Sequence, residues 1–502
     1  MKTASAETVI DAKGLVVAPG FIDAHAHSDI ALLANPLAES KIHMGVTTEV
    51  SYASCGRSAG PMIGAAKEDL KRNAETRFSL DAYGIEFNWT TLEDFFRKLE
   101  TLGISTNFAT LIGAGTVRAA VVGYENREPT NAELERMKAH VADAMKQGAF
   151  GITTGLTYTP GSYAKFDELV ELSKVVAEYG GIYVTHLRSE SNMLIECVKE
   201  AIEIGERAGL PAVISHFKAS GKENWGKVNQ ALDMMMGARA RGIDVTCDLY
   251  PYRAGMSRLR ECLSPWAHEG GIDNMIELLK DPRNRDRLRR EMSEGLPNWS
   301  SWVKEDGWEN MMISTCPSNR QYEGKMIADL AEEEGADPFD FAFDLLIKDN
   351  AATRIIMFSM SEEDVRTVMR SLLSMFITDG YALAPYGEIS RGKPHPRCYG
   401  TFPRALGEYV RGENVLTLQE AIRKMTSFAA QRFGLEGRGL IREGYWGDVT
   451  VFDPETIIDK ATYQDPHRYP EGIKYVLVNG VVTIEDGEHT GARAGRILRR
   501  GT

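Results

Sequence analysis

Two histidines separated by one residue end an apolar run, and their side chains are suited to metal binding. The run begins at Phe21, and the pair is His25 and His27. Side chains two positions apart on a strand point to the same face, so both imidazoles are expected to project together. Neutral imidazole is a frequent ligand of zinc. A His-x-His pair alone is weak evidence, and its place at the end of an apolar run strengthens it.

Further potential ligands follow other apolar runs in the same manner. They are Cys55, His186, His216 and Asp379. Taken singly, each has an ordinary structural explanation, such as a small buried thiol or a carboxylate that caps a turn. Taken together they predict a metal centre with zinc as its ion, because zinc is bound by thiolate, imidazole and carboxylate groups.

The segments that must position these residues alternate between strands and amphipathic helices. The expected strands are residues 21–25, 47–51, 108–112, 150–153, 182–186, 212–216, 243–248 and 373–379. Thr130 and Glu133 predict a capping box at the start of one helix, and Gly148 is placed to end it. Eight strand–helix units predict an α/β fold, the (β/α)8 TIM barrel, which gathers catalytic residues at the C-terminal ends of its strands.

Two parts of the chain depart from this alternation. A long insertion, about residues 253–352, separates the last two expected strands, and such insertions often act as lids. Its four tryptophans suit either a pocket wall or a small core of the insertion itself. Short strands follow residue 435, where Asn479-Gly480 predicts a hairpin. We therefore expect the barrel at residues 17–435, and a small β-sandwich-like domain made from residues 1–16 and 436–502.

The composition is that of a globular protein with an acidic surface. Of 502 residues, 43% are hydrophobic and 26% charged, and the net charge of -13 disfavours nucleic acid as a partner. No uninterrupted apolar run is long enough to span a membrane, and the N-terminus has no apolar signal core, so no membrane partner is expected. Six scattered cysteines without a CxxC pair favour the reducing cytoplasm. The sequence leaves a homo-oligomer open.

Over nearly its whole length, the chain resembles the N-acyl-D-amino-acid deacylases (D-aminoacylases) of the metal-dependent amidohydrolase superfamily. The resemblance is carried by the motifs PGFIDAHAH (19–27), THLRSE (185–190), SHFKASG (215–221), DLYPY (248–252), PWAHEGG (265–271), TDG (378–380) and HPR (395–397), and by residues 151–164. The first motif is typical of the superfamily, whereas the set is typical of the deacylases. The implied activity is zinc-dependent hydrolysis of N-acyl-D-amino acids to a carboxylate and a free D-amino acid.

The resemblance also implies how the metal ligands divide. The tight zinc would be bound by Cys55, His186 and His216, and the cysteine takes the place of the carboxylated lysine that bridges two metals in many amidohydrolases. A second metal position would be surrounded by His25, His27 and Asp379, and its occupancy is left open.

Residues that handle the substrate follow from the site and from the resemblance. Asp379 is expected to take a proton from the attacking water and to return it to the departing amine. Lys218 would anchor the substrate α-carboxylate, and its spacing from His216 puts both on one face if the strand continues. The resemblance adds Tyr250 and Arg397 as helpers and Tyr158 as a contact to the scissile carbonyl. His395, in a loop soon after Asp379, either lines the mouth of the site or packs.

The preferred side chain of the substrate stays open at this point. Arg253, Arg258 and Arg260 follow the DLYPY motif, and an arginine suits a second carboxylate, as in an acidic D-amino acid. The alternative explanation, which the sequence favours, is that they are three solvated arginines on a loop. Met256 and Leu259 lie among them and favour an apolar side chain instead.

The chain also departs from the family pattern, and other readings remain. Gly113-Ala114-Gly115 stands where a Gly-His-Gly is common, and the short N-terminal stretch predicts an incomplete small β domain. A dipeptidase or a cyclic-amide hydrolase such as a hydantoinase is an alternative enzyme, although Thr153-Thr154-Gly155 offers no bridging lysine. A metal-free barrel scaffold is the alternative without catalysis.

Overall fold

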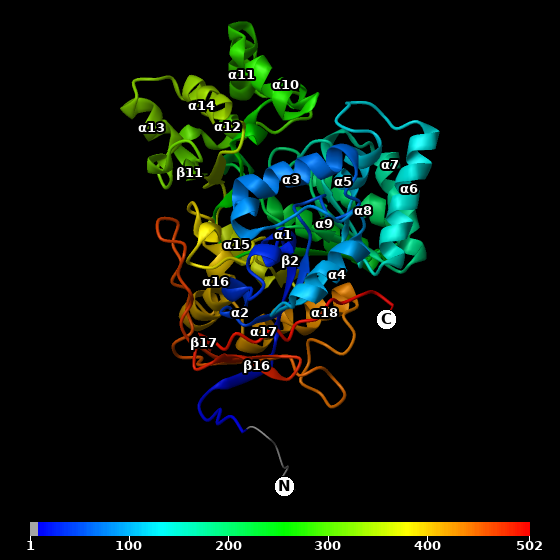
Figure 1. The fold of residues 1–502 in the computed structure, drawn as a ribbon, viewed down its shortest axis with the longest axis vertical. Coiled ribbons are helices and arrows are strands. Elements are labelled where there is room, and N and C mark those ends of the chain that lie inside the picture. The colour runs from blue at the N-terminus through cyan, green and yellow to red at the C-terminus, as the bar shows by residue number, and fades with distance from the viewer. Residues whose placement is uncertain (1–8, 502) are drawn as a thin grey trace.

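A closed ring of parallel strands forms the centre of the protein. The computed structural model describes residues 9–501 (Figure 1). The ring consists of β2 (Phe21–Ala26), β3 (Val46–Ser51), β4 (Asn107–Thr110) continued by β5 (Ile112–Gly113), β6 (Gly151–Gly155), β7 (Ile182–His186), β8 (Ala212–Ile214), β9 (Val245–Leu249) and β13 (Ser374–Phe376). Neighbours pair in this order, and a parallel bridge between Ala26 and Gly380 closes the ring. The predicted (β/α)8 barrel is therefore confirmed.

Two strands end earlier than the sequence predicts, and the difference matters for the site. Strand β8 ends at Ile214 and β13 at Phe376, short of His216 and Asp379. Both of these residues have left-handed backbones, with φ of 35° and 47°. Histidine and aspartate are among the residues that tolerate this conformation best. The chain thus leaves the strand and turns before it presents either side chain.

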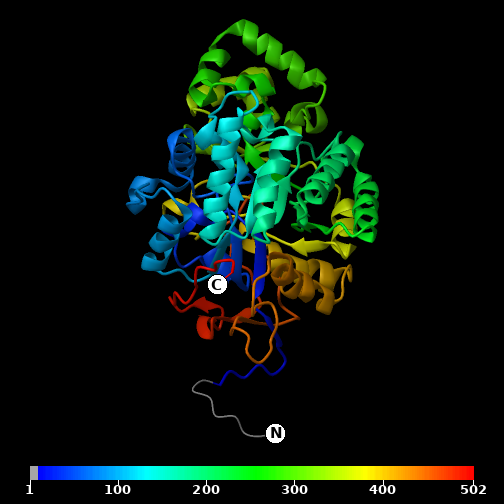
Figure 2. The same ribbon diagram turned by 90° about the vertical axis from the view of Figure 1, so that its right-hand side faces the viewer.

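Helices surround the ring on its outside (Figures 1 and 2). They are α1 (Asp29–Ala34), α2 (Glu39–Ile42), α3 (Gly64–Phe78), α4 (Leu92–Leu102), α5 (Ala114–Val121), α6 (Asn131–Lys146), α7 (Phe166–Glu178), α8 (Leu194–Ala208), α9 (Lys227–Ala240), α15 (Glu362–Arg370), α16 (Arg397–Arg404) with its π-helical continuation η9 (Ala405–Gly412), α17 (Leu418–Met425) and α18 (Ser427–Phe433). The predicted capping box of Thr130 and Glu133 starts α6, which ends at Lys146 before Gly148.

The insertion is a separate layer with its own hydrophobic core. Its strands β10 (Gly255–Arg258), β11 (Met311–Thr315) and β12 (Arg354–Met357) form an antiparallel sheet, which extends past the predicted limit of residue 352. Its helices are α10 (Gly271–Lys280), α11 (Pro282–Glu294), α12 (Trp302–Asp306), α13 (Ile327–Glu333) and α14 (Pro338–Lys348). Trp308 is buried in this core, whereas Trp299 and Trp302 pack against it and also line the main cavity. Both interpretations of the tryptophans therefore apply, and Trp299 and Trp302 satisfy the two at once.

A small antiparallel sheet lies at the opposite end of the barrel from the insertion (Figures 1 and 2). Its strands, in spatial order, are β1 (Val16–Pro19), β14 (Val449–Phe452), β15 (Ile473–Val478), β16 (Val481–Glu485) and β17 (Glu488–His489). Asn479 and Gly480 join β15 to β16 with positive φ, as a tight hairpin requires. Strand β1 pairs with β14 and therefore belongs to this sheet. The domain limits at residues 16/17 and 435/436 remain predictions.

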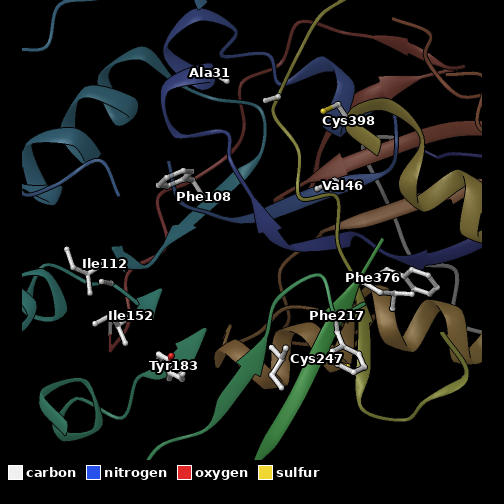
Figure 3. Close-up of a cluster of buried hydrophobic side chains, with 14 of the residues drawn as sticks. Ala31, Val46, Phe108, Ile112, Ile152, Tyr183, Phe217, Cys247, Phe376 and Cys398 are labelled. Carbon is white, nitrogen blue, oxygen red and sulfur yellow. The ribbon is translucent and has the colours of Figure 1, made fainter. Parts of the chain in front are cut away.

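The barrel core lies between the strands and the helices that cover them. Figure 3 shows the side chains of Phe108, Ile112, Ile152, Tyr183 and Phe376 packed in one buried cluster. Strands of a parallel sheet are buried on both faces, which explains why the sequence shows them as apolar runs. Within residues 9–501, no helix combines the length and the apolar character needed to cross a bilayer.

Candidate metal centre and active site

Six potential metal ligands meet where the barrel strands end. The donor atoms of His25, His27, Cys55 and Asp379 all lie within 4.8 Å of one another, and so do those of Cys55, His186 and His216. The two groups share Cys55, and every member is buried. The structure therefore brings together all six residues that the sequence singled out, in two overlapping sets.

The distances around the thiol suit a common metal ion. Cys55 Sγ lies 3.5 Å from His25 Nε2, 3.9 Å from His27 Nε2 and 3.6 Å from His216 Nε2. Ligands of one tetrahedral zinc, each about 2.0–2.3 Å from the ion, are about 3.3–3.8 Å apart. On the other side, Asp379 Oδ1 lies 2.8 Å from His27 Nε2. His186 Nδ1 and His216 Nε2 are also 2.8 Å apart, and both 2.8 Å separations are those of hydrogen-bonded groups. The distances around the sulfur and the mixture of sulfur, nitrogen and oxygen donors fit zinc.

Three of the histidines have a polar group beside the ring nitrogen that faces away from the centre, and for His27 and His216 it forms a hydrogen bond. His27 Nδ1 donates to the Tyr52 carbonyl over 2.8 Å, and His216 Nδ1 lies 2.8 Å from Glu190 Oε1. His25 Nδ1 lies 3.5 Å from a carboxylate oxygen of Asp248. Such partners fix the tautomer and orientation of metal-binding histidines.

Glu190 and Asp248 were not assigned a role from the sequence. Their signal was present, because each lies inside one of the motifs quoted above, beside or just after a ligand-bearing strand. Asp248 also accepts the backbone N–H of His216, which helps to hold the left-handed turn.

The surroundings of Cys55 and Asp379 favour the ionised forms of both acidic ligands. Burial alone would raise the pKa of the Cys55 thiol, but the charge of His25 and hydrogen bonds from His186 and His216 outweigh it and lower that pKa well below its usual range. Burial also opposes ionisation of Asp379, whose pKa is nevertheless held well below normal, mainly by Arg397 and His216. A buried thiolate and carboxylate that lie close together need positive charge to balance them, either protons on the histidines or a bound cation. Metal binding replaces those protons with the cation.

The loop that carries Cys55 depends on glycines in the neighbouring strands. A Cβ at Gly155 would lie 2.3 Å from the Cys55 carbonyl oxygen, and one at Gly113 would lie 2.5 Å from the backbone of Arg57. The Gly-Ala-Gly segment thus allows close approach of two backbones. No local sequence pattern explains these glycines, because the contact joins segments that are far apart in the chain.

Replacing Gly155 with alanine is expected to displace Cys55. Overpacking of this kind costs about 1–3 kcal/mol, and here it acts on a metal ligand, so both stability and zinc content should fall. Chemical unfolding and metal analysis measure the two effects. The matched control is Gly237→Ala in α9, where the nearest atom is 3.9 Å away and alanine should stabilise the helix by about 0.5–1 kcal/mol. A Gly155→Ala protein with unchanged stability and zinc would contradict the packing argument.

A cavity of about 300 Å³ opens in front of the ligands, between the barrel and the insertion. This is the lower end of the volume range typical of small-molecule sites. The cavity is lined by the predicted substrate residues Tyr158, Lys218, Tyr250, Arg258 and Arg397. Residues of the insertion, including Trp299, Trp302 and His268, complete its wall.

Lys218 and Arg397 form a cationic corner of this cavity around Tyr250. Lys218 Nζ lies 5.8 Å from the centre of the Tyr250 ring, and the Arg397 guanidinium carbon lies 4.6 Å from it. Strand β8 ends at Ile214, so the condition under which Lys218 and His216 would share a strand face is not met. The turn after β8 nevertheless brings Lys218 Nζ within 2.9 Å of His216 Nδ1 and 2.6 Å of Glu190 Oε1.

His395 does not line the cavity, so its expected contact with substrate is not supported. It is fully buried, and its Nε2 lies 2.8 Å from the Ala254 carbonyl. Its Nδ1 accepts the backbone N–H of Arg397 over 3.0 Å. His395 therefore positions the start of α16, and with it Arg397.

A buried ion network holds the segment around Asp379. Lys41 Nζ donates to Asp23 and to the Thr378 hydroxyl, both over 2.6 Å, and to the Gly380 carbonyl over 3.2 Å. The Thr378 N–H in turn donates to Asp23 over 2.9 Å. Sequence reasoning missed Lys41, because a lysine in a helix gives no sign that it will be fully buried.

Known proteins resemble this chain over almost its whole length. Residues 8–484 match the model of the amidohydrolase family. The chain is 33% identical over 500 residues to a D-aminoacylase and, separately, to an N-acyl-D-glutamate deacylase of Alcaligenes xylosoxydans xylosoxydans, covering all of this chain and 90% of each relative. The crystal structure of an N-acyl-D-glutamate deacylase from Bordetella bronchiseptica, complexed with zinc and a phosphonate inhibitor, has a TM-score of 0.79 and 30% identity, with 97% of this chain and 90% of that one covered.

The match includes the barrel, the insertion and the segments that carry all six ligands. The family assignment therefore agrees with the geometry of the site and with the resemblance seen in the motifs. This chain belongs to the amidohydrolase family, in the branch of the N-acyl-D-amino-acid deacylases.

Proposed function

We propose that the protein hydrolyses the amide bond of N-acyl-D-amino acids and releases a carboxylate and a free D-amino acid. The observation that carries the proposal is the pair of overlapping ligand groups, joined by Cys55, beside a cavity with a cationic corner. The relatives named above act on this class of substrate, which gives the D-configuration its support.

Zinc is the proposed cofactor. Cys55, His186 and His216 would hold the tight ion, while His25, His27 and Asp379 surround a second position with Cys55 between the two. When bound, zinc lowers the pKa of a water molecule and polarises the acyl carbonyl.

Asp379 is proposed as the proton carrier. Its carboxylate lines the cavity, is buried and is held in the ionised form, so it can accept a proton from the attacking water. It then donates that proton to the departing amine nitrogen, which an amide needs because the unprotonated amine leaves poorly. Tyr158 also lines the cavity, close to His186, and it is proposed to donate from its hydroxyl to the acyl oxygen as negative charge develops there.

Lys218, Tyr250 and Arg397 are proposed to bind the α-carboxylate of the substrate. Arg397 Nη1 lies 2.9 Å from Asp379 Oδ2, but the pair is not aligned as a hydrogen bond. Within the described residues its buried Nε and Nη1 have no acceptor, so both remain able to donate to an anion. Buried donors of this kind are costly unless a ligand satisfies them.

Replacing Lys218 with methionine is expected to raise KM for N-acetyl-D-amino acids by about 10- to 100-fold, because a hydrogen bond to a charged group contributes about 1.5–3 kcal/mol. Steady-state kinetics would separate KM from kcat, and metal analysis would check that zinc is retained. Lys222→Met, which removes an exposed lysine from the same loop, is the matched control. An unchanged KM would refute the anchor.

The function is tested with a panel of N-acetyl D- and L-amino acids, assayed with and without a chelator. We expect hydrolysis of D-substrates only, loss of activity with the chelator and recovery with zinc. Dipeptides ending in a D-residue and a hydantoin belong in the same panel. Faster turnover of either would assign the protein to one of the alternative hydrolases, and failure to bind zinc would favour a scaffold.

We also propose a cytoplasmic location. All six cysteines are unpaired and buried, and free thiols are typical of a reducing compartment.

A further inference from the structure

Two arginines lie directly opposite each other in the sheet of the insertion. Strands β10 and β12 are antiparallel, and Arg258 pairs with Arg354 in their register. Opposed residues of an antiparallel pair project from the same face, and like charges in this position are destabilising. Both arginines are only 8% exposed, and both line the main cavity. Such an arrangement gains stability from an anion bound between them.

The carboxylate beside Arg258 does not fully satisfy it. Glu261 Oε1 lies 3.7 Å from Arg258 Nη1, but it is closer to Arg260 Nε, at 3.2 Å. One carboxylate therefore serves two guanidinium groups. In addition, Arg258 Nε is buried and has no hydrogen-bond acceptor within residues 9–501. A buried donor without a partner is costly, and a ligand carboxylate would satisfy it.

A short series of side-chain contacts connects the residue next to Arg258 with the tight metal group. The neighbouring Ser257 hydroxyl is 3.5 Å from the Tyr158 hydroxyl. The Tyr158 ring in turn lies 4.9 Å from the ring of His186. The C-terminal end of β10, which carries both Ser257 and Arg258 on the cavity wall, is thus close to the place where the scissile bond is proposed to bind.

Arg354 is connected in the same way to the second ligand group. Its Nη1 donates to the Tyr381 hydroxyl over 3.4 Å, and the Tyr381 ring lies 5.8 Å from that of His27. Arg354 is therefore separated from a ligand of the second group by one tyrosine, while Arg258 lies on the cavity wall next to the residue that contacts Tyr158. The α-carboxylate anchor, Lys218 with Arg397, is made of other residues of the same cavity wall.

We propose that Arg258 and Arg354 bind the side-chain carboxylate of an acidic substrate, so that the protein prefers N-acyl-D-glutamate or N-acyl-D-aspartate to neutral N-acyl-D-amino acids. The proposal rests on the function proposed above and adds the substrate class. It does not follow from relatedness, because the chain is equally identical to a D-aminoacylase and to an N-acyl-D-glutamate deacylase. Guanidinium groups bind carboxylates through paired, charge-assisted hydrogen bonds.

The test compares kcat/KM of the zinc-loaded enzyme for four substrates: the N-acetyl derivatives of D-glutamate, D-aspartate and D-methionine, and N-succinyl-D-methionine. The wild-type protein should prefer an acidic D-residue over D-methionine by about 100-fold or more, since sites built around buried polar groups reject ligands that leave them unpaired. The last substrate carries its second carboxylate on the acyl group, and a preference for it would overturn the assignment to the side chain.

Arg258→Met and Arg354→Met should each lower kcat/KM for the acidic substrates by about 10- to 100-fold, the loss expected for a charged hydrogen bond. The D-methionine derivative has no side-chain carboxylate for the arginines to bind, so its kcat/KM should fall far less than that of the acidic substrates. The matched control is Arg253→Met, because Arg253 belongs to the same segment, has a side chain that is 65% exposed and pairs with Glu362 outside the cavity. Equal losses on every substrate would indicate a structural role and contradict the proposal.

Failure of the two proposals can be distinguished. Hydrolysis of N-acetyl-D-methionine at least as fast as that of the acidic substrates overturns only the specificity. If no N-acyl-D-amino acid is hydrolysed, the proposed function fails. The arginine pair is then judged by thermal unfolding with N-acetyl-D-glutamate, which should raise the Tm of the wild type but not of Arg258→Met. No rise in the wild type would overturn the pair as a carboxylate site.

Discussion

Asp379→Asn is expected to lower kcat by about 10²- to 10⁴-fold, the usual contribution of a positioned acid–base group, and to leave zinc bound. Asparagine keeps the shape of the side chain but can neither accept the proton of the attacking water nor carry it to the amine. Metal binding should survive because Cys55, His186 and His216 form a ligand group without Asp379. The loss corresponds to about 3–5 kcal/mol of transition-state stabilisation.

Single-turnover and steady-state kinetics, together with metal analysis, measure this effect. The matched control is Asp344→Asn, because Asp344 lies on α14 with a side chain that is 69% exposed and pairs with Arg285 away from the cavity. Turnover close to that of the wild type would remove Asp379 from the mechanism. Loss of zinc along with activity would show instead that Asp379 acts mainly as a ligand.

Cys55→Ala is expected to lower the affinity for zinc more than Asp379→Asn does. Cys55 is the residue that the two ligand groups share, so its loss leaves neither group complete. Replacing a partner outside the ligand shell typically costs about 10- to 100-fold in metal affinity, and removal of a ligand should cost about 100-fold or more. Activity should fall in proportion to the zinc that is lost.

Equilibrium dialysis against zinc, followed by assay of the same samples, gives both quantities. Cys197→Ala provides the matched control, because Cys197 is a buried thiol of α8 outside the cavity. Circular dichroism should show both variants folded. If Cys55→Ala retains the zinc and the turnover of the wild type, the shared thiolate has no role in the centre.

Much of the fold could be predicted from the sequence because parallel strands are buried on both faces. Each barrel strand is a short apolar run, and the ligands His25, His27 and His186 could be found at the ends of such runs. Their convergence follows from the barrel, which aligns all carboxyl ends at one rim.

The remaining features depend on contacts between distant segments. Nothing in the sequence shows that His216 and Asp379 lie in left-handed turns past the ends of their strands, or that His395 faces the backbone of Arg397 instead of the cavity. The pairing of Arg258 with Arg354 requires the register of the insertion sheet. The cluster of arginines near Arg258 can be recognised in the sequence, but the strand that pairs with it and carries Arg354 cannot.

Zinc K-edge X-ray absorption of the active protein tests the central claim most directly. The account predicts one sulfur at about 2.3 Å and imidazole nitrogens at about 2.0–2.1 Å from zinc, with the sulfur contribution lost in Cys55→Ser. A spectrum with only nitrogen and oxygen neighbours in the wild-type protein would contradict the metal centre described here.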